Sequence, residues 1–568
     1  MHNRSPNGPT LAPEPTRKAS PAHLSDRAGL AIGIAALAGV LTVSGCKVGP
    51  DYQRPESALN EAWLPKSASD PAVAENVRWW ESFDDPTLTA LIQSAWAENL
   101  TLKQAGMRVL ESRAARGISV GNFFPQTQNL TGGIQNNRIS GNAPRAGGDR
   151  SYADNALGLQ VAWELDFWGK FRRGIEAADA EVLLAVADYD AVLVSLTAGV
   201  ASNYILIRAF EERLMFARAN VQLQTETLKL TQARFDAGAV SELDVATARA
   251  TLANTQALIP EFENALQQSR LALCVLLGRT PSDLQAQLAT QAGAIPKVPE
   301  APQQIAAGVP ADLLRRRPDV RAAERVAAAQ SARIGQAKAD LYPSISIQGS
   351  TGFVSSNFER DNKPGLGNIF DANSFAGFIG LGLNLPILNY GRIENSVRVQ
   401  DARYEQAVAA YQESVLRAAG EVEAGLSEFL YAKERTTYLT DAVRASNRSA
   451  DLSLLQYRAG AVDFIRVNNA QSDLVRQQDS LVAARAAIAL GAVQTYRALG
   501  GGWEIRQGQE FVNQETVDRL RARTDWGNVV APAWQEGRDL GFPRPTTTAT
   551  DSTTPTSSTS PTTPGAGK

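Results

Sequence analysis

Histidine, cysteine and methionine are scarce in this chain of 568 residues, which has 2, 2 and 3 of them respectively. Both histidines, His2 and His23, precede Cys46, so cleavage at that cysteine would leave a mature chain with no histidine. Without imidazole there is no Ser-His-Asp triad, no histidine general base and no histidine-bound metal. The sequence therefore indicates neither an enzyme nor a metalloprotein, and it predicts no cofactor.

An excess of one charge is also lacking. Lys and Arg together number 56, Asp and Glu number 59, and the formal net charge is -3. Proteins that bind nucleic acid usually carry a clear basic excess, so we expect no nucleic-acid partner. The pair Gly380 and Gly382 lies within an alternating pattern and not before a helix, so it does not indicate a phosphate-binding loop.

Long hydrophobic runs are lacking except near the start, where residues 28–43 carry no charge. This run is short for a membrane-spanning helix, follows basic residues and leads into Val-Ser-Gly-Cys. The pattern indicates a signal peptide over residues 1–45 and a lipobox, in which Cys46 is acylated and becomes the first mature residue. The alternative is a buried thiol beside an ordinary apolar segment. Cys274, within LALCVLLG, is expected in the packed core.

The chain contains an internal repeat. The segment DFWGKFRRGIEAA resembles ILNYGRIENSVRV, and QARFDAGAVSELDVATARA resembles LQYRAGAVDFIRVNNAQSD. Three glycine pairs keep one spacing of 222 residues: Gly169 and Gly391, Gly238 and Gly460, Gly278 and Gly500. A constant spacing predicts two copies of one structural unit.

Each copy has a segment that alternates with period two, as strands with one apolar face do. The apolar positions are Leu157, Leu159, Val161, Trp163, Leu165 and Phe167 in the first copy, and Ile379, Leu381, Leu383, Leu385 and Ile387 in the second. We expect two β-hairpins that open after Pro125 and Pro343, and such strands suit a membrane barrel. The expected membrane-interface aromatics are Trp163, Trp168 and Tyr390.

Proline is missing from residues 171–236 and 392–458, which predicts two helices that are each about 100 Å long. Apolar residues recur every seven positions on two seams of the first of these helices, as in a ring of coiled helices. A helix from Pro86 to about Asn122 and another from about Ser241 to Leu277 are each expected to be about 55 Å long. Stacked end to end, two such helices would match one long helix.

Two hairpins supply four strands per chain, whereas a single-chain membrane barrel needs about eight to close. Open strand edges cannot face lipid, because their backbone amides would have no partners. The count therefore predicts that several chains share one barrel, although it does not fix their number.

Three motifs carry a resemblance to a known family. They are KVGPDYQRP after Cys46, WWESFDDPTLTALIQSAWAENLTLKQA over residues 79–105, and VPADLLRRRPDVRAAERVAAA over residues 309–329. They resemble NodT-type outer-membrane lipoproteins of the TolC superfamily, which serve resistance–nodulation–division (RND) efflux pumps. The resemblance implies a mostly α fold with a β membrane part: a homotrimeric duct whose shared 12-stranded β-barrel continues into a 12-helix periplasmic α-barrel.

The resemblance also implies partners and site residues. A periplasmic adaptor and an inner-membrane RND pump would be the protein partners, and membrane lipid would hold the acylated Cys46 in the outer membrane. The adaptor-docking tip is expected at Gly238, Ala239, Val240, Ser241, Gly460, Ala461 and Val462. The pore constriction is expected at Asp244, Tyr457, Asp463, Arg466 and Asn469. An Asp244–Arg466 ion pair could hold the tip shut, although both could equally be solvated surface charges.

The expected organisation follows in chain order. It comprises a signal peptide (1–45), a lipid-anchored segment (46–85), a first repeat (86–279), a connector (280–310), a second repeat (311–503), a C-terminal equatorial segment (504–540) and a disordered Thr/Ser/Pro tail (541–568).

The function expected from these patterns is passive conduction of pumped drugs or other small solutes across the outer membrane. One alternative is the exit duct of a protein-secretion system. A second is a lipid-anchored periplasmic coiled-coil scaffold without a pore, which would leave the two alternating hairpins unexplained.

Overall fold

The computed structural model of the chain describes residues 46–57, 59–60, 62–64, 76–142, 150–282, 284–288, 297–305, 307, 316–356 and 369–530. The expected signal peptide and tail lie outside the described residues. The chain divides into two units, one up to Gln514 and one from Glu515 onward. In the second unit, α11 (Gln514–Arg523) and η6 (Gly527–Val530) are the regular elements of the described part.

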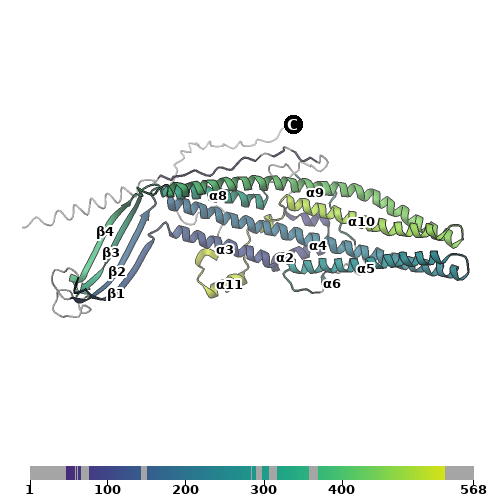
Figure 1. Ribbon diagram of the computed structural model, residues 1–568, viewed down its shortest axis with the longest axis horizontal. Helices are drawn as coiled ribbons and strands as arrows, with labels where there is room; N and C mark the ends of the chain where they lie inside the picture. The colour runs from purple at the N-terminus through teal and green to yellow at the C-terminus, as the bar shows by residue number, and fades with distance from the viewer. Residues whose placement is uncertain are drawn as a thin grey trace, which may run out of the picture. The chain divides into compact units, whose positions relative to one another are not determined.

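The first unit is mostly helical and has one sheet (Figure 1). Its helical elements are η2 (Asn76–Phe83), α2 (Pro86–Glu98), α3 (Leu100–Gly121), α4 (Lys170–Asp236), α5 (Glu242–Leu276), α6 (Gln285–Leu288), α8 (Pro318–Ala339), η4 (Ala372–Ser374), α9 (Arg392–Arg458), α10 (Phe464–Ala498) and η5 (Glu504–Arg506). Its strands are β1 (Thr127–Arg138), β2 (Ser151–Leu165), β3 (Ser344–Ser356) and β4 (Phe375–Asn384).

The same unit occurs twice along the chain. In each copy a helix of 22 residues leads into a hairpin, a helix of 67 residues and a returning helix of 35 residues. The glycine pairs found in the sequence share their backbone conformation: φ is 78° at both Gly169 and Gly391, and 73° and 77° at Gly238 and Gly460. The predicted internal repeat is confirmed down to the backbone of its turns.

Shorter helices are stacked end to end beside each long helix. At the joint of α5 and α3, Asn99 Oδ1 accepts from the Leu102 amide (2.8 Å), and Asn99 Nδ2 donates to the Leu276 carbonyl (2.9 Å). At the joint of α10 and α8, Arg317 Nη1 donates to the Ala498 carbonyl (2.9 Å). One side chain thus bridges the two helix ends at each joint, as the expected stacking requires.

The first helix is shorter than expected. The sequence predicted one helix from Pro86 to about Asn122, whereas the chain breaks at Asn99 into α2 and α3. Asn99 has an extended backbone (φ −60°, ψ 126°) and caps α3 with its side chain, which ends α2 at the same point. Only α3, about 33 Å long, enters the stack, while α2 packs against α4.

The second joint has a pH-dependent contact. Arg317 Nε donates to Asp319 Oδ1 (2.8 Å) and Arg317 Nη2 donates to Asp319 Oδ2 (2.9 Å). Burial raises the pKa of Asp319, but the hydrogen bonds and charge of Arg317 outweigh burial, so this pKa lies below its ordinary value. The native chain therefore takes up this proton less readily than the unfolded chain, and the contact stabilises the fold at neutral pH.

We expect Asp319→Asn to lower the melting temperature at pH 7. The difference from the wild type should shrink as the pH falls below about 4 and through the lower pKa of the folded state, because the wild-type carboxyl then becomes neutral too. Thermal melts between pH 7 and pH 3 measure this. A difference that persists unchanged in acid would contradict it.

The sheet is antiparallel, with the strand order β1-β2-β3-β4. Its register places apolar residues of neighbouring strands in rows on one face: Leu165, Ile345 and Leu383; Trp163, Ile347 and Leu381; Leu157, Phe353 and Phe375. The predicted apolar alternation is confirmed within the strands. β4 ends at Asn384, two residues before Pro386, so Leu385 and Ile387 lie beyond the strand in which they were expected.

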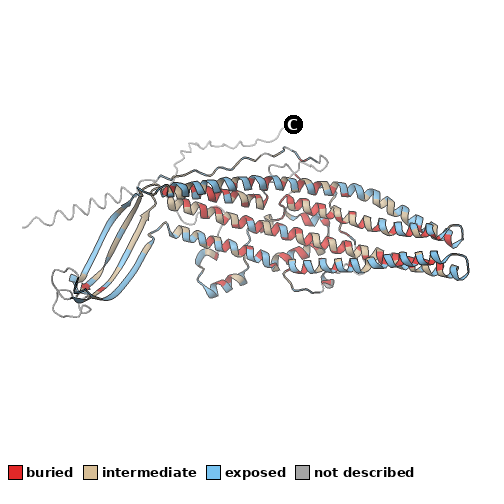
Figure 2. Cartoon of the chain, in the orientation of Figure 1, coloured by how far each residue is buried: buried red, intermediate tan, exposed pale blue. Residues whose placement is uncertain are grey.

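The two long helices differ in burial (Figure 2). α4 has 29 buried residues and forms the core of the unit, whereas α9, of equal length, has 13. Among the described residues, α4 is the helix that by length and composition could cross a membrane, but 61% of its most apolar stretch is buried inside the protein, as in a core helix. Cys274 is fully buried, as predicted.

Candidate functional site

The segment after Cys46 is fixed where the sheet joins the helices. Cys46 itself is exposed. The Val48 amide donates to the Trp168 carbonyl (3.1 Å), just after β2, and Lys47 Nζ lies 2.6 Å from a Glu176 carboxylate oxygen on α4. The exposed cysteine therefore emerges at the boundary between the sheet and the helices.

Arg173 of α4 binds the segment that follows Cys46, and the sequence did not single out this residue. Its side chain is 1% exposed. Its guanidinium donates to the carbonyls of Val48 and Gly49 (3.1 Å each), to Asp51 (3.0 Å) and to Glu176 (3.0 Å). In sequence it is one of two adjacent arginines, and only the depth of its position in the packed helices distinguishes it from half-buried Arg172.

Gly49 shows how closely the segment approaches α8. Its φ is +95°, and a Cβ on Gly49 would lie 2.3 Å from the Gly335 Cα. Only glycine fits both the conformation and the space. The glycine in KVGPDYQRP therefore has a local structural reason, because it lets the segment after Cys46 cross α8.

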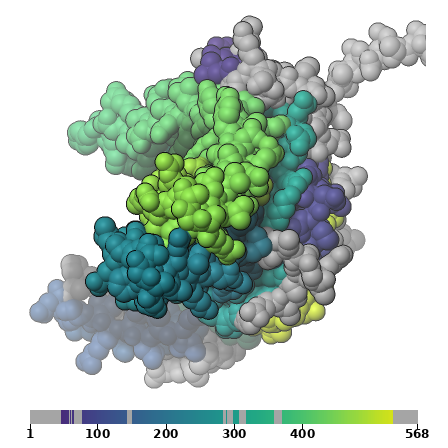
Figure 3. Space-filling model, turned by 90° about the vertical axis from the view of Figure 1, so that its right-hand side faces the viewer, coloured from purple at the N-terminus to yellow at the C-terminus, as the bar shows by residue number. Residues whose placement is uncertain are grey.

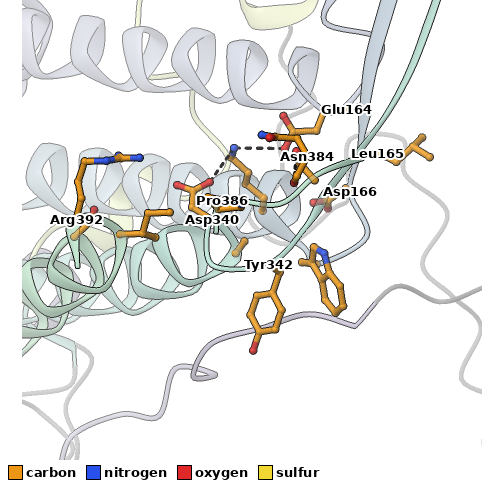
Figure 4. Close-up of a pocket in the computed structure, with 14 residues that line it drawn as sticks. Glu164, Leu165, Asp166, Asp340, Tyr342, Asn384, Pro386 and Arg392 are labelled. Atoms are coloured by element: carbon orange, nitrogen blue, oxygen red, sulfur yellow. Dashed lines mark hydrogen bonds and ion pairs between the residues drawn. The ribbon is translucent and has the colours of Figure 1, made fainter. Parts of the chain in front are cut away.

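A cavity of about 310 Å³ lies beneath the sheet at the same junction (Figure 4). Lys170 Nζ lies between Asp340 Oδ1 (3.0 Å) and Glu164 Oε1 (3.5 Å). Burial lowers the pKa of Lys170, but the two carboxylates outweigh burial and hold this pKa above its ordinary value. The ion pairs thus tie β2, α4 and the end of α8 together where β2 ends and β3 begins.

The three expected interface aromatics are placed differently from one another. Trp163 Nε1 donates to the Phe123 carbonyl (3.1 Å), and Trp168 Nε1 donates to the Pro343 carbonyl (2.8 Å). Both bonds are made at the helix end of the strands. Tyr390 is 95% exposed and has φ +49°, so its side chain projects from the chain at the turn before α9.

The expected tip comprises two exposed turns at the opposite end of the helices (Figure 3). After α4 the Gly238 amide donates to the Phe235 carbonyl (2.8 Å) and the Ala239 amide to the Arg234 carbonyl (2.8 Å), which is a Schellman motif. Gly460 and Ala461 repeat this pattern after α9. A Cβ on Gly238 would meet no atom within 4 Å, so the left-handed conformation, and not crowding, explains this glycine.

Tyr457, expected at the pore constriction, is instead packed inside the tip. Its side chain is 1% exposed and contacts Phe464 edge-on, with ring centroids 5.7 Å apart. The Arg234 guanidinium lies over the Tyr457 ring, 4.6 Å from its centroid, and also donates to the Tyr457 carbonyl. Arg234 and Tyr457 thus join the end of α4 to the end of α9 within one chain.

The other expected constriction residues lie at the helix starts beyond the turns. Asp244 forms a capping box: its Oδ2 accepts from the Ser241 amide (3.0 Å) and hydroxyl (2.9 Å). Asp463, Arg466 and Asn469 are exposed at the start of α10. No Asp244–Arg466 ion pair forms among the described residues of this one chain, and the Asp244 carboxylate is used by its own helix cap.

A polar seam joins α4 to α10 above the tip, where sequence reasoning expected apolar seams. Its buried α4 positions keep the four-three-four spacing of a coiled-coil seam and are Asn220, Gln224, Thr227 and Thr231. Asn220 Nδ2 donates to Gln478 Oε1 (2.7 Å), and Gln471 Nε2 donates to Thr227 Oγ1 (2.8 Å). The same spacing search applied to polar residues would have found it.

Buried charged residues of α4 bind the connector and the C-terminal segment. Asp190, fully buried, accepts from Arg506 Nε (2.6 Å) in the C-terminal segment. Arg208 Nη2 donates to the Leu288 carbonyl (2.8 Å), and Glu212 accepts from the Val298 amide (3.2 Å), both in the connector. Among the described residues, no group of three or more His, Cys, Asp or Glu could hold a metal ion.

Known sequences identify the family to which this architecture belongs. Residues 91–279 and 309–501 match the family described as outer membrane efflux protein, one match in each repeat and together more than half of the chain. The toluene efflux pump outer membrane protein TtgC of Pseudomonas putida is 30% identical over 476 residues, which are 82% of this chain and 95% of that protein. Nodulation protein T of Rhizobium leguminosarum bv. viciae is 32% identical over 468 residues, 82% of this chain and 92% of that protein.

Solved structures give the same result. The outer-membrane channel OprN matches with a TM-score of 0.72 at 32% identity, over 81% of this chain and all of that chain. The MtrE outer membrane channel of Neisseria gonorrhoeae, in its open state, matches with a TM-score of 0.70 at 26% identity, over 81% of this chain and 99% of that chain. The chain therefore belongs to the outer membrane efflux protein family, a family of transport proteins, and has the fold of TolC-like outer-membrane channels.

Proposed function

We propose that three copies of the chain form a lipid-anchored exit duct, through which drugs or other small solutes expelled by an inner-membrane RND pump cross the outer membrane. The duct conducts passively and makes or breaks no covalent bond. The similarity to a toluene efflux component supports cargo of small size.

The sheet is the observation that carries this proposal. Within the described part of the chain, β1 and β4 are each paired on one side only, so the four strands form an open sheet. Its apolar face is uncovered, with Ile379 84%, Leu381 75% and Leu383 73% exposed. Apolar faces of this kind suit lipid, and open edges in lipid need partner strands. Three chains would supply twelve strands and remove every edge.

The anchor and the tip fit the two ends of such a duct. Arg173 fixes the chain just after Cys46, beside the end of β2, so a lipid on Cys46 would enter the membrane next to the sheet. At the other end the turns 237–241 and 459–463 present mostly exposed small residues, which would let an adaptor helix approach closely. Asp244, Asp463, Arg466 and Asn469, near these turns, are the side chains proposed to line the constriction.

The test is the native mass of the full-length protein, extracted from membranes in mild detergent. We expect a trimer in which each chain carries acyl chains. Cys46→Ser should remove the acyl mass, whereas Cys274→Ser, which changes the buried thiol, should retain it. A stable monomer would leave four strands without closure and would favour the scaffold without a pore. Acyl mass retained on Cys46→Ser would contradict the anchor.

A further inference from the structure

The joint of α8 and α10 borders a cavity of about 280 Å³ that the efflux function so far leaves unused. Its charged lining consists of Arg317, Arg417, Arg497, Asp319 and Glu421, which come from α8, α9, α10 and the residue before α8. Three guanidinium groups thus meet two carboxylates around one opening.

Both carboxylates are already committed to Arg317. This side chain, 7% exposed, donates to Asp319, to Glu421 (2.6 Å) and to the Ala498 carbonyl (2.9 Å). The guanidinium groups of Arg417 and Arg497 make no hydrogen bond or ion pair with any residue that the structure describes. The side chains that line the cavity therefore carry a net positive charge, and the guanidinium donors of Arg417 and Arg497 are unused among the described residues.

The cavity opens on one particular face of the helix layer. The segment after Cys46 lies on α9 at Gln412, which donates to the Glu56 carbonyl (3.3 Å). Glu421 follows Gln412 by nine residues, which is about 180° around a helix. On α9 the cavity thus lies opposite the segment that follows Cys46.

In the proposed duct this face is the lumen, because segments appended inside the duct would block it. The inference that the cavity faces the lumen therefore rests on the proposed function. The existence of the cavity and its charge do not, since they belong to a single chain.

The first repeat shows that the joint does not need these arginines. At the spacing of 222 residues, Ser195 and Val275 stand where the second repeat has Arg417 and Arg497. Asn99 bridges the first joint as Arg317 bridges the second. In the first repeat the helices thus stack without arginine at these two positions, where Arg279 pairs with Glu98 instead, and the presence of Arg417 and Arg497 in the second repeat needs a different reason.

We propose that this cavity binds anions, through the paired guanidinium groups of Arg417 and Arg497, and that its ligands are small organic anions carrying a carboxylate or phosphate group. Planar guanidinium donors match both groups in bidentate geometry. A trimer would present three such sites at one level of the lumen. Cargo bearing these groups would be held there on its way out.

Binding of inorganic pyrophosphate to the full-length protein in detergent tests the site, by isothermal titration calorimetry at low salt. We expect one site per chain, and affinity weakened about tenfold or more in Arg417→Gln/Arg497→Gln, because hydrogen bonds to charged groups are lost. Arg417→Lys/Arg497→Lys should bind with intermediate affinity, because lysine keeps the positive charge but lacks the planar bidentate donors of a guanidinium. Arg448→Gln, an exposed arginine of α9 away from the cavity, should bind as the wild type does.

Unchanged affinity in the double glutamine variant, or no binding to the wild type, would overturn the site. A second measurement, ion current through the protein in planar bilayers, tests its location. We expect pyrophosphate to reduce the wild-type current and not that of the double glutamine variant. If calorimetry shows the site but pyrophosphate leaves the current unchanged, or no current flows, the site stands and the luminal position in the proposed duct fails.

Discussion

Replacing Asp190 by alanine is expected to reduce the free energy of unfolding by about 3–5 kcal/mol, the cost of removing one partner from a buried ion pair. Asp190 is fully buried, and its carboxylate meets Arg506 Nε at 2.6 Å and Arg321 Nη1 at 3.5 Å. Arg506 is itself only 9% exposed. Without Asp190, the Arg506 guanidinium would remain buried but would lose the carboxylate to which it donates.

Heating of the full-length protein in one detergent, followed by circular dichroism, measures this loss as a fall in melting temperature. Asp441→Ala is the matched control. It removes the carboxylate of an exposed pair with Arg444 (2.8 Å), and such pairs contribute about 0–1 kcal/mol. Equal falls in melting temperature in the two variants would show that the ion pair of Asp190 with Arg506 does not hold the C-terminal segment on α4.

The long helices and the strands could be predicted from the sequence because their signals are local. The absence of proline predicted α9 over Arg392–Arg458, as observed, and predicted a start of α4 at Phe171, one residue after the observed start. The strand faces followed from alternation, since a one-residue slip would reverse every side chain. Constant spacing of glycines revealed the repeat, because each of these glycines needs positive φ.

The break at Asn99 could not be predicted with the same certainty. An asparagine within a helical pattern is compatible with a helix interior and with a cap, and only the neighbouring end of α5 decides between them. Tyr457 shows the same limit at the tip. The family resemblance implied a place at the constriction, whereas in this chain Tyr457 packs against Phe464 and Arg234.

Buried charges were the least predictable part of the candidate site. Asp190 and its partner Arg506 are 316 residues apart, so no local pattern connects them. Arg173 and the Asp51 carboxylate are 122 residues apart. The unequal burial of α4 and α9 was equally hidden, because both helices have the same length and arise from the same repeat.

Replacing Arg173 by alanine is expected to release the segment that follows Cys46. The buried guanidinium satisfies the carbonyls of Val48 and Gly49, and a buried polar group left without its partner costs about 1–3 kcal/mol. The two carbonyls together give a loss of about 2–6 kcal/mol, felt mainly by this segment. Arg173→Lys should restore little of the loss, because an ammonium cannot reach several acceptors in fixed geometry.

Hydrogen–deuterium exchange of residues 46–57, followed by mass spectrometry on the full-length protein, measures this release. Exchange should accelerate in Arg173→Ala and remain at the wild-type rate in Arg398→Ala, which removes an exposed arginine of α9. Unchanged exchange in both variants would mean that the other contacts, such as Lys47 with Glu176 and Val48 with Trp168, hold the segment without Arg173. Faster exchange in Arg173→Ala only would show that α4 fixes the segment of the proposed anchor. One buried arginine would then set the point at which a lipid on Cys46 meets the membrane.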